Sequence, residues 1–237
     1  MQPLALELSS DRSILEPLQT ANTIDRQVEE LKTVLEEATD PPVTLVGHSW
    51  GAWLGYILTS RYPRLVKRLI LVSSGSFVEK YAPLTQEIRL SRLDDDGKRE
   101  VARLLELFNM NQAGNGDNDF ARIGEIFSKV DSFDPLPQGP AEIEFSLDIF
   151  RSVWREATKL RRSGRLLEMG RDIVCPVTAI HGEYDSHPAA GVEGPLSLVI
   201  RNFRFILLKN CGHKPWIERR AREKFLEILH KEITSAG

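Results

Sequence analysis

The residues with the clearest chemical potential lie in the segment Gly47-His48-Ser49-Trp50-Gly51. A strand-like apolar run at residues 43–46 precedes it and an amphipathic helix follows, as a nucleophile elbow requires. Glycines two residues either side of Ser49 leave room for a sharp turn. That turn lifts the serine hydroxyl above the sheet edge, where the helix dipole favours developing negative charge. We therefore predict Ser49 as a nucleophile and the backbone N–H of Trp50 as an oxyanion donor.

A serine hydroxyl is a weak nucleophile at neutral pH, so it needs a base, and the base needs an orienting acid. Asp185 follows a predicted strand at residues 173–180, and His213 follows another at residues 203–208. Loops at the carboxyl ends of parallel strands gather at one sheet edge. We therefore expect Ser49, His213 as base and Asp185 as acid to meet there.

Each assignment has a plainer alternative. The turn can hold an incidental serine, Glu183 is the substitute acid, and Cys211 is a weaker candidate nucleophile because it lies close to His213. Of the other histidines, His48 is expected in packing inside the elbow and His230 on the surface of the last helix. His181 is placed at a strand end and His187 in a loop. No helical pair of histidines and no Cys/His cluster at ligand spacing occurs, so we expect no metal. The chemistry needs no cofactor.

Strands and helices alternate at both ends of the chain. Apolar and alternating runs predict strands at residues 3–8, 43–46, 69–72, 173–180 and 203–208. Helices are predicted after a cap at Asn22 with Asp25 in its first turn, after Ser49, and in two further segments, residues 195–200 and 221–233. This order indicates an α/β class with a parallel sheet covered by helices on both faces.

The segment between residues 77 and 170 has a different character. It shows helical stripes, such as those through Val101, Phe120 and Trp154, and no convincing strand. We assign residues 1–76 and 171–237 to an α/β core and residues 77–170 to a helical cap over one end of the sheet. The basic run at residues 159–165 is expected at a solvated helix end, with binding of an anionic substrate as the less favoured alternative.

Composition narrows the class of protein. The chain has 237 residues and a formal net charge of −3, which does not favour nucleic acid or an anionic membrane surface as a partner. No run of 18 apolar residues occurs, and residues 1–10 lack the features of a signal peptide. Cys175 and Cys211 are expected at opposite ends of neighbouring strands, beyond disulfide reach. Free thiols fit a cytoplasmic protein. The partner that we expect is a small-molecule substrate.

At these residues the chain resembles the α/β-hydrolase superfamily of serine hydrolases. The resemblance rests on Val-Gly-His-Ser-Trp-Gly-Ala at the elbow, His-Gly-Glu-Tyr-Asp at residues 181–185 and Cys-Gly-His-Lys-Pro-Trp-Ile-Glu at residues 211–218. Ser-Trp-Gly is similar to the proline iminopeptidase-like and carboxylesterase branches, and a serine at position 49 argues against branches with an aspartate nucleophile. The resemblance implies an α/β-hydrolase fold, a Ser49–His213–Asp185 triad and a cap that shapes the substrate pocket.

The resemblance departs at the N-terminus. Members of the superfamily begin with several strands and a His-Gly loop that supplies a second oxyanion donor, whereas the His-Gly pair here is His181-Gly182, after the elbow. We expect either a shortened member or a chain whose start is missing. The uncovered sheet edge would favour a homodimer.

The leading interpretation is hydrolysis of a small-molecule ester, or an amide, through an acyl-enzyme. One alternative is an aminopeptidase or a carbon–carbon bond hydrolase on the same triad. An aminopeptidase needs acidic cap residues to hold the substrate amine, for which Glu142, Glu144 and Asp148 are candidates. The other alternative is a catalytically weak ligand-binding protein on a hydrolase scaffold.

Overall fold

The computed structural model describes residues 2–10, 12–109, 116–137 and 146–235. Within them, a parallel sheet of four strands has the order β1-β2-β3-β4. The register sets His48 opposite Val72 and Val72 opposite Ile180, so the carboxyl ends of the strands lie side by side. The strands are β1 (Val43–His48), β2 (Val66–Val72), β3 (Val177–Gly182) and β4 (Phe203–Leu208).

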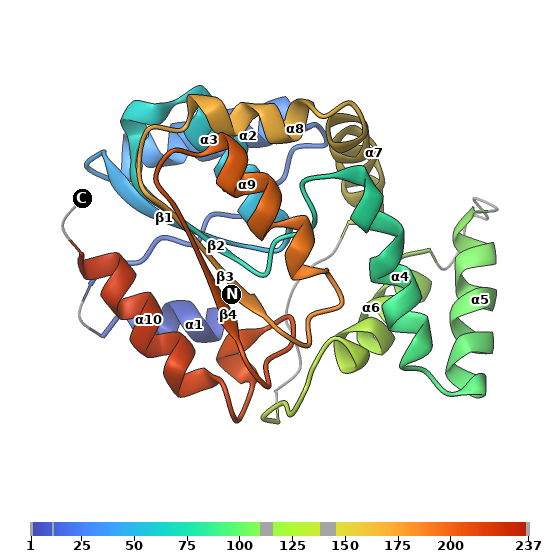
Figure 1. Ribbon diagram of the computed structural model, residues 1–237. Helices are drawn as coiled ribbons and strands as arrows, with labels where there is room; N and C mark the ends of the chain where they lie inside the picture. Colours follow the sequence, from blue (N-terminus) through green and yellow to red (C-terminus); the bar gives the residue numbers. More distant parts are fainter. Residues whose placement is uncertain (1, 11, 110–115, 138–145, 236–237) are drawn as a thin grey trace.

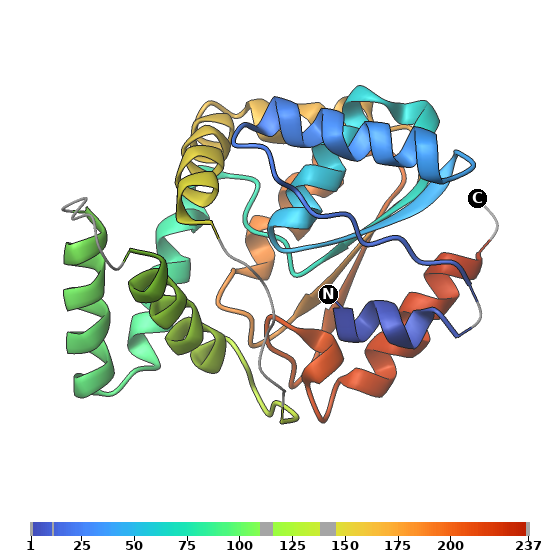
Figure 2. The same ribbon diagram turned by 180° about the vertical axis from the view of Figure 1, so that it is seen from behind.

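Helices cover both faces of the sheet (Figures 1 and 2). One face carries α2 (Ile24–Ala38), α3 (Trp50–Arg61), α8 (Arg165–Glu168) and α9 (Glu193–Val199). The other carries α1 (Gln2–Leu8) and α10 (Arg222–Thr234). Two apolar clusters follow this division, one on each face of the sheet.

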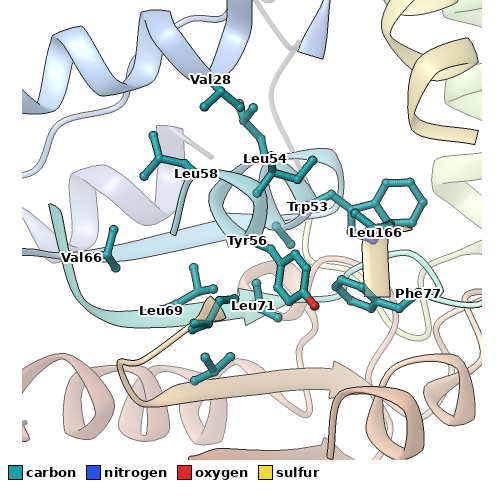
Figure 3. Packing of buried hydrophobic residues seen from close by; sticks show 14 of the residues in the cluster. Val28, Trp53, Leu54, Tyr56, Leu58, Val66, Leu69, Leu71, Phe77 and Leu166 are labelled. Atoms are coloured by element: carbon teal, nitrogen blue, oxygen red, sulfur yellow. The ribbon is translucent and has the colours of Figure 1, made fainter. Parts of the chain in front are cut away.

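Helix α3 is the centre of the larger cluster and carries the elbow at its start. Figure 3 shows Leu54 and Leu58 beside Val28 of α2, and Tyr56 toward the sheet residues Leu69 and Leu71. All six are almost completely buried. Burying a side chain of this size contributes about 1.5–3 kcal/mol, so the packing holds α3, and with it the elbow, firmly on the sheet.

Further helices lie to one side of the sheet (Figure 1). They are α4 (Ala82–Ser91), α5 (Asp95–Asn109), α6 (Gly116–Val130) and α7 (Leu147–Arg162). Helices α5 and α6 share a small apolar cluster of their own, which includes Val101 and Ile123. The predicted helical stripes are therefore present, and within the described part of residues 77–170 no strand forms beyond an isolated bridge between Pro135 and Glu218.

The predicted strand at residues 3–8 is wrong, because this segment is helix α1. Leucines at positions 4, 6 and 8 alternate like a strand. Only Leu4 and Leu8 are buried, whereas Leu6 is 67% exposed. A separation of four residues is the spacing of one helix face, and both buried leucines pack in the cluster that contains Phe225 of α10. No strand therefore precedes β1 among the described residues.

Smaller differences have local causes. The cap of α2 is Thr23 instead of Asn22, and its hydroxyl accepts from the N–H of Arg26, while Asp25 is in the first turn as predicted. Strand β3 begins at Val177, later than predicted, because Pro176 has no N–H to pair with a neighbouring strand. Both cysteines are free and buried, as expected. In the described residues no helix has the length and apolarity needed to cross a membrane.

Candidate active site

Ser49 occupies a strained turn between β1 and α3. Its φ of 53° and ψ of −115° lie outside the helical and extended regions. The turn is held because the Ser49 N–H donates to the carbonyl of Val72 at 3.1 Å. A β carbon at Gly47 would lie 2.3 Å from the carbonyl oxygen of Gly51, so only glycine fits there. Gly51 itself faces open space, and the steric need predicted for both glycines applies to position 47 alone.

Trp50 is the first residue of α3, so its backbone N–H has no partner within the helix. This leaves the amide available at the helix N-terminus, where the dipole favours negative charge. The indole of Trp50 is anchored separately, since its Nε1 donates to the side chain of Gln27 at 3.0 Å. The backbone of Trp50 is thus fixed beside the hydroxyl of Ser49.

His213 and Asp185 form a buried pair. The Nδ1 of His213 donates to Oδ2 of Asp185 at 2.8 Å, and the carboxylate side chain is fully buried. Burial alone would raise the pKa of Asp185, but the charges and hydrogen bonds of His213 and His187 hold it well below its usual range. A carboxylate that stays ionised accepts the Nδ1 proton, which leaves Nε2 of His213 as the acceptor nitrogen.

His187 shares the same carboxylate, which the sequence analysis did not predict. Both its Nδ1 and its backbone N–H donate to Oδ1 of Asp185 at 2.9 Å, and its ring stacks on His213 with centroids 4.7 Å apart. Burial lowers the pKa of His187, although the charge of Asp185 and the hydrogen bond to it act in the opposite direction. Because Asp185 bonds to two imidazoles, its orientation is fixed from both sides.

His48 supports the loop that carries His213. Its Nε2 donates to the carbonyl of His213 at 2.9 Å, and its ring lies edge-on to Trp216 with centroids 4.6 Å apart. Burial first, and then the neighbouring His213, keep the pKa of His48 well below its usual value, so this ring is neutral. The expected packing role of His48 is therefore confirmed.

Glu218 ties the loop that carries His213 to the chain that leaves α6. Its side chain is 0% exposed. The carboxylate accepts hydrogen bonds of 2.8–2.9 Å from three backbone N–H groups, those of Phe133, Asp134 and Gly212. Nearby, the His213 N–H donates to the carbonyl of Asp131 at 2.8 Å. The position of the histidine thus depends on a buried carboxylate five residues later in the chain.

Replacing Glu218 with alanine is expected to destabilise the protein by about 3 kcal/mol, because three backbone N–H groups lose their acceptor, that of Gly212 in a buried bond and those of Phe133 and Asp134 in half-buried ones. Urea denaturation measures this loss of stability. Glu227→Ala on the exposed face of α10 is the matched control, with an expected change below about 0.5 kcal/mol. Equal stabilities of the two variants would contradict the role given to Glu218.

A cleft of about 1150 Å³ opens beside these residues. Ser49, Trp50, His187 and His213 line it together with side chains of α4, α6 and α7. Asp185 lies behind His213, buried and away from the cleft. The hydrogen bonds of the described residues do not include one between Ser49 and His213. Such contacts often tighten only when substrate binds.

Of the residues predicted from the sequence, Asp185 and His213 are in contact, and Ser49, Trp50 and His213 border one cleft. Glu183, the alternative acid, is exposed. His181 bonds to the carbonyl of His187 at 2.7 Å.

The thiol of Cys211 is buried, and burial raises its pKa, so Cys211 is a poor candidate nucleophile. Among the proposed amine-binding acids, Asp148 is exposed and does not line the cleft. Glu142 and Glu144 lie outside the described residues.

Asp185, His187 and His213 also bring three potential metal-ligand atoms within 4.8 Å of one another. Two hydrogen bonds to one carboxylate account for this grouping. The expectation that no metal takes part stays a prediction.

Comparisons with known proteins agree with this architecture. A family model described as "alpha/beta hydrolase fold" matches residues 9–218. The pimeloyl-[acyl-carrier protein] methyl ester esterase of Nitrosospira multiformis is 28% identical over 189 residues, which cover 76% of this chain but only 65% of that protein. The proline iminopeptidase of Heyndrickxia coagulans is 27% identical over 228 residues, covering 90% of this chain and 74% of that one.

Solved structures show the same fold at low identity. The crystal structure of VinJ has a TM-score of 0.64 and 18% identity, and the match covers 90% of this chain and 72% of that one. The proline iminopeptidase of Mycobacterium smegmatis has a TM-score of 0.56 and 17% identity, covering 91% and 75%. The strand order, the elbow and the buried Asp–His pair therefore occur on a fold that is known from other proteins.

Proposed function

The chain belongs to the α/β-hydrolase fold family, and on that premise we propose that it is a serine hydrolase that cleaves a small-molecule ester through an acyl-enzyme on Ser49. The observation that carries the proposal is the buried hydrogen bond between Asp185 and His213, placed beside a cleft that Ser49 also lines. A base oriented by an ionised acid next to a strained serine is what acyl transfer requires.

The chemistry follows from the proton positions. His213 holds its Nδ1 proton toward Asp185, so Nε2 takes the proton of Ser49 as Oγ attacks the ester carbonyl. The oxyanion forms beside the N–H of Trp50. His213 then returns the proton to the leaving alcohol, and the same base activates the water that releases the acid. Residues 77–170 serve as the cap that shapes the cleft.

An aminopeptidase is the alternative that the similarity to a proline iminopeptidase favours. Such an enzyme must hold a protonated amine, for which a carboxylate is the natural partner. Among the described residues that line the cleft, Asp131 is the carboxylate, and Arg89 already occupies both of its oxygens at 2.6–3.0 Å. This charge arrangement makes an ester the better-supported substrate.

Labelling with a fluorophosphonate probe tests the proposal directly. We expect a single adduct by intact mass, located at Ser49 by peptide mapping, because only an activated serine reacts with the probe. In parallel, aryl esters should be hydrolysed faster than aminoacyl arylamides of similar size. A folded protein that takes up no probe would instead favour a ligand-binding role on this scaffold, and faster arylamide hydrolysis would favour the aminopeptidase.

A further inference from the structure

We propose that the cleft selects substrates that carry a negatively charged group, a carboxylate in the first place, and that Lys214 binds this group. The inference rests on the proposed ester hydrolysis and names its substrate class. It concerns the residue directly after His213, which lines the same cleft as Ser49. A group bound at Lys214 therefore shares the cleft with the carbonyl that Ser49 would attack.

The ammonium group of Lys214 lacks an ionic partner within the described part of the chain. Its Nζ donates to the hydroxyl of Ser128 on α6 at 3.1 Å, which uses one of its three donors. Burial lowers the pKa of Lys214, although the nearby charge of Asp131 acts in the opposite direction. A cation that has lost water and has only a hydroxyl in return gains from a bound anion.

The nearby carboxylate of Asp131 does not serve as the ionic partner of Lys214. Asp131 is 4% exposed and forms a bidentate pair with Arg89 of α4. Arg89 also lies over the ring of Phe127, with its guanidinium carbon 4.8 Å from the centroid. Both partners are therefore held in place, and Asp131 remains committed to Arg89 when Lys214 meets a ligand.

The described lining of the cleft is strongly biased toward positive charge. Against the single carboxylate of Asp131 stand five cationic side chains: Arg89, Arg151, Arg155, Arg161 and Lys214. Arg161 is held by Glu79 at 2.8 Å, whereas Arg155 forms no ion pair among the described residues. Although Asp131 and Glu79 compensate two of these cations, an excess of positive charge remains in the lining, and such an excess attracts ligands of the opposite sign. The anionic-substrate alternative raised by the sequence thus gains support at Lys214, outside the basic run at residues 159–165.

The rest of the cleft lining suits an organic molecule with an apolar part and not a free inorganic ion. Aromatic rings line the cleft beside the cations, and they are contributed by Trp50, Phe120, Phe127, Phe150 and Trp154. The rings of Phe150 and Trp154 stack with centroids 5.7 Å apart. Apolar walls with a few placed charges are typical of sites for amphipathic small molecules. The fitting substrate is therefore an ester with an apolar body and a carboxylate that reaches Lys214 within the same cleft.

A matched pair of substrates tests this. The first is the 4-nitrophenyl ester of an aliphatic dicarboxylic acid with its far carboxyl free, and the second has that carboxyl as a methylamide. For the parent we expect kcat/KM to be about tenfold higher, or more, for the free acid, as one charge-assisted contact implies. A parent ratio of one or below overturns the proposal without any variant.

Variants place the effect at the residue. Lys214→Met should lower the ratio of the two kcat/KM values by about tenfold, mainly through KM of the free acid, and Lys214→Arg should restore most of it. Lys224→Met, at an exposed lysine of α10, is the control and should keep the parent ratio. A parent ratio retained in Lys214→Met would overturn the assignment.

Binding separates this proposal from the catalytic one. If the parent hydrolyses neither ester, the proposed hydrolysis has failed, but calorimetry with the same two compounds still decides the charge preference. Performed on Ser49→Ala, which cannot turn the esters over, calorimetry should show at least about fivefold tighter binding of the free acid. Equal affinities would reject the anion site even in an active enzyme.

Discussion

Replacing Ser49 with alanine is expected to lower ester turnover by about ten-thousandfold or more, with no loss of folded protein. The reason is that no acyl-enzyme can form without the hydroxyl, whereas the rest of the site stays in place. Ser49 Oγ makes no hydrogen bond within the described residues, so its removal takes no contact from the fold. Alanine also has the same β carbon, and the strained φ of 53° costs it no more than it costs serine. Turnover and the unfolding transition are both measured.

Ser73 offers a matched control for this substitution. It also follows a strand, has a positive φ of 47°, and carries a buried hydroxyl without a partner among the described residues. It does not line the cleft. Ser73→Ala should therefore keep turnover within about twofold and change stability by less than about 1 kcal/mol. If Ser49→Ala retained the parent's turnover, as Ser73→Ala should, an acyl-enzyme on Ser49 would be excluded.

Much of this site follows from local sequence rules, because each main residue lies at the end of a strand or in the short loop that follows it. The apolar runs before Ser49 and His213 are β1 and β4. The strand before Asp185 begins later than predicted, after Pro176, and ends at Gly182, two residues beyond the predicted end. Once the strands are parallel, their carboxyl ends must meet at one edge. The positions of these three residues thus required no knowledge of side-chain contacts.

What the sequence concealed depends on contacts between distant segments. Glu218 ends the motif at residues 211–218, but the sequence gives no sign that its carboxylate accepts from the N–H groups of Phe133 and Asp134, more than 80 residues earlier. The sequence also does not show that α6 brings Ser128 against Lys214. The helix α1 was missed for a similar reason, since only its docking on α10 decides that Leu4 and Leu8 share a face.

His187 was placed in a loop without a role, although its spacing from Asp185 held a usable signal. A residue two positions after an aspartate is well placed to donate its backbone N–H to that side chain, and here the ring of His187 adds a second bond to the same oxygen. The consequence is an acid whose two oxygens serve different histidines. Substituting Asp185 therefore disturbs the hydrogen bonds of two histidines at once.

Asp185→Asn is expected to lower kcat by about a thousandfold to ten-thousandfold. An amide has one acceptor oxygen, so it cannot accept from both His213 and His187 as the carboxylate does. If the amide nitrogen faces His213, the ring must carry its proton on Nε2 and can no longer take the proton of Ser49. The pH–rate profile and ester kinetics measure this, with Glu183→Gln, at the exposed alternative acid, as the control.

The same variant should show the electrostatic contribution of Asp185 to stability. The pKa of this carboxyl is depressed in the folded protein, so its stabilising effect is fully present above the unfolded pKa of about 3.9 and is lost as pH falls toward the folded value. The parent should therefore be more stable than Asp185→Asn at pH 7, and the difference in unfolding free energy should shrink on acidification below about pH 4. A difference that stayed constant with pH would mean that the carboxylate is not held ionised between the two histidines, and the acid of the site would have to be sought elsewhere.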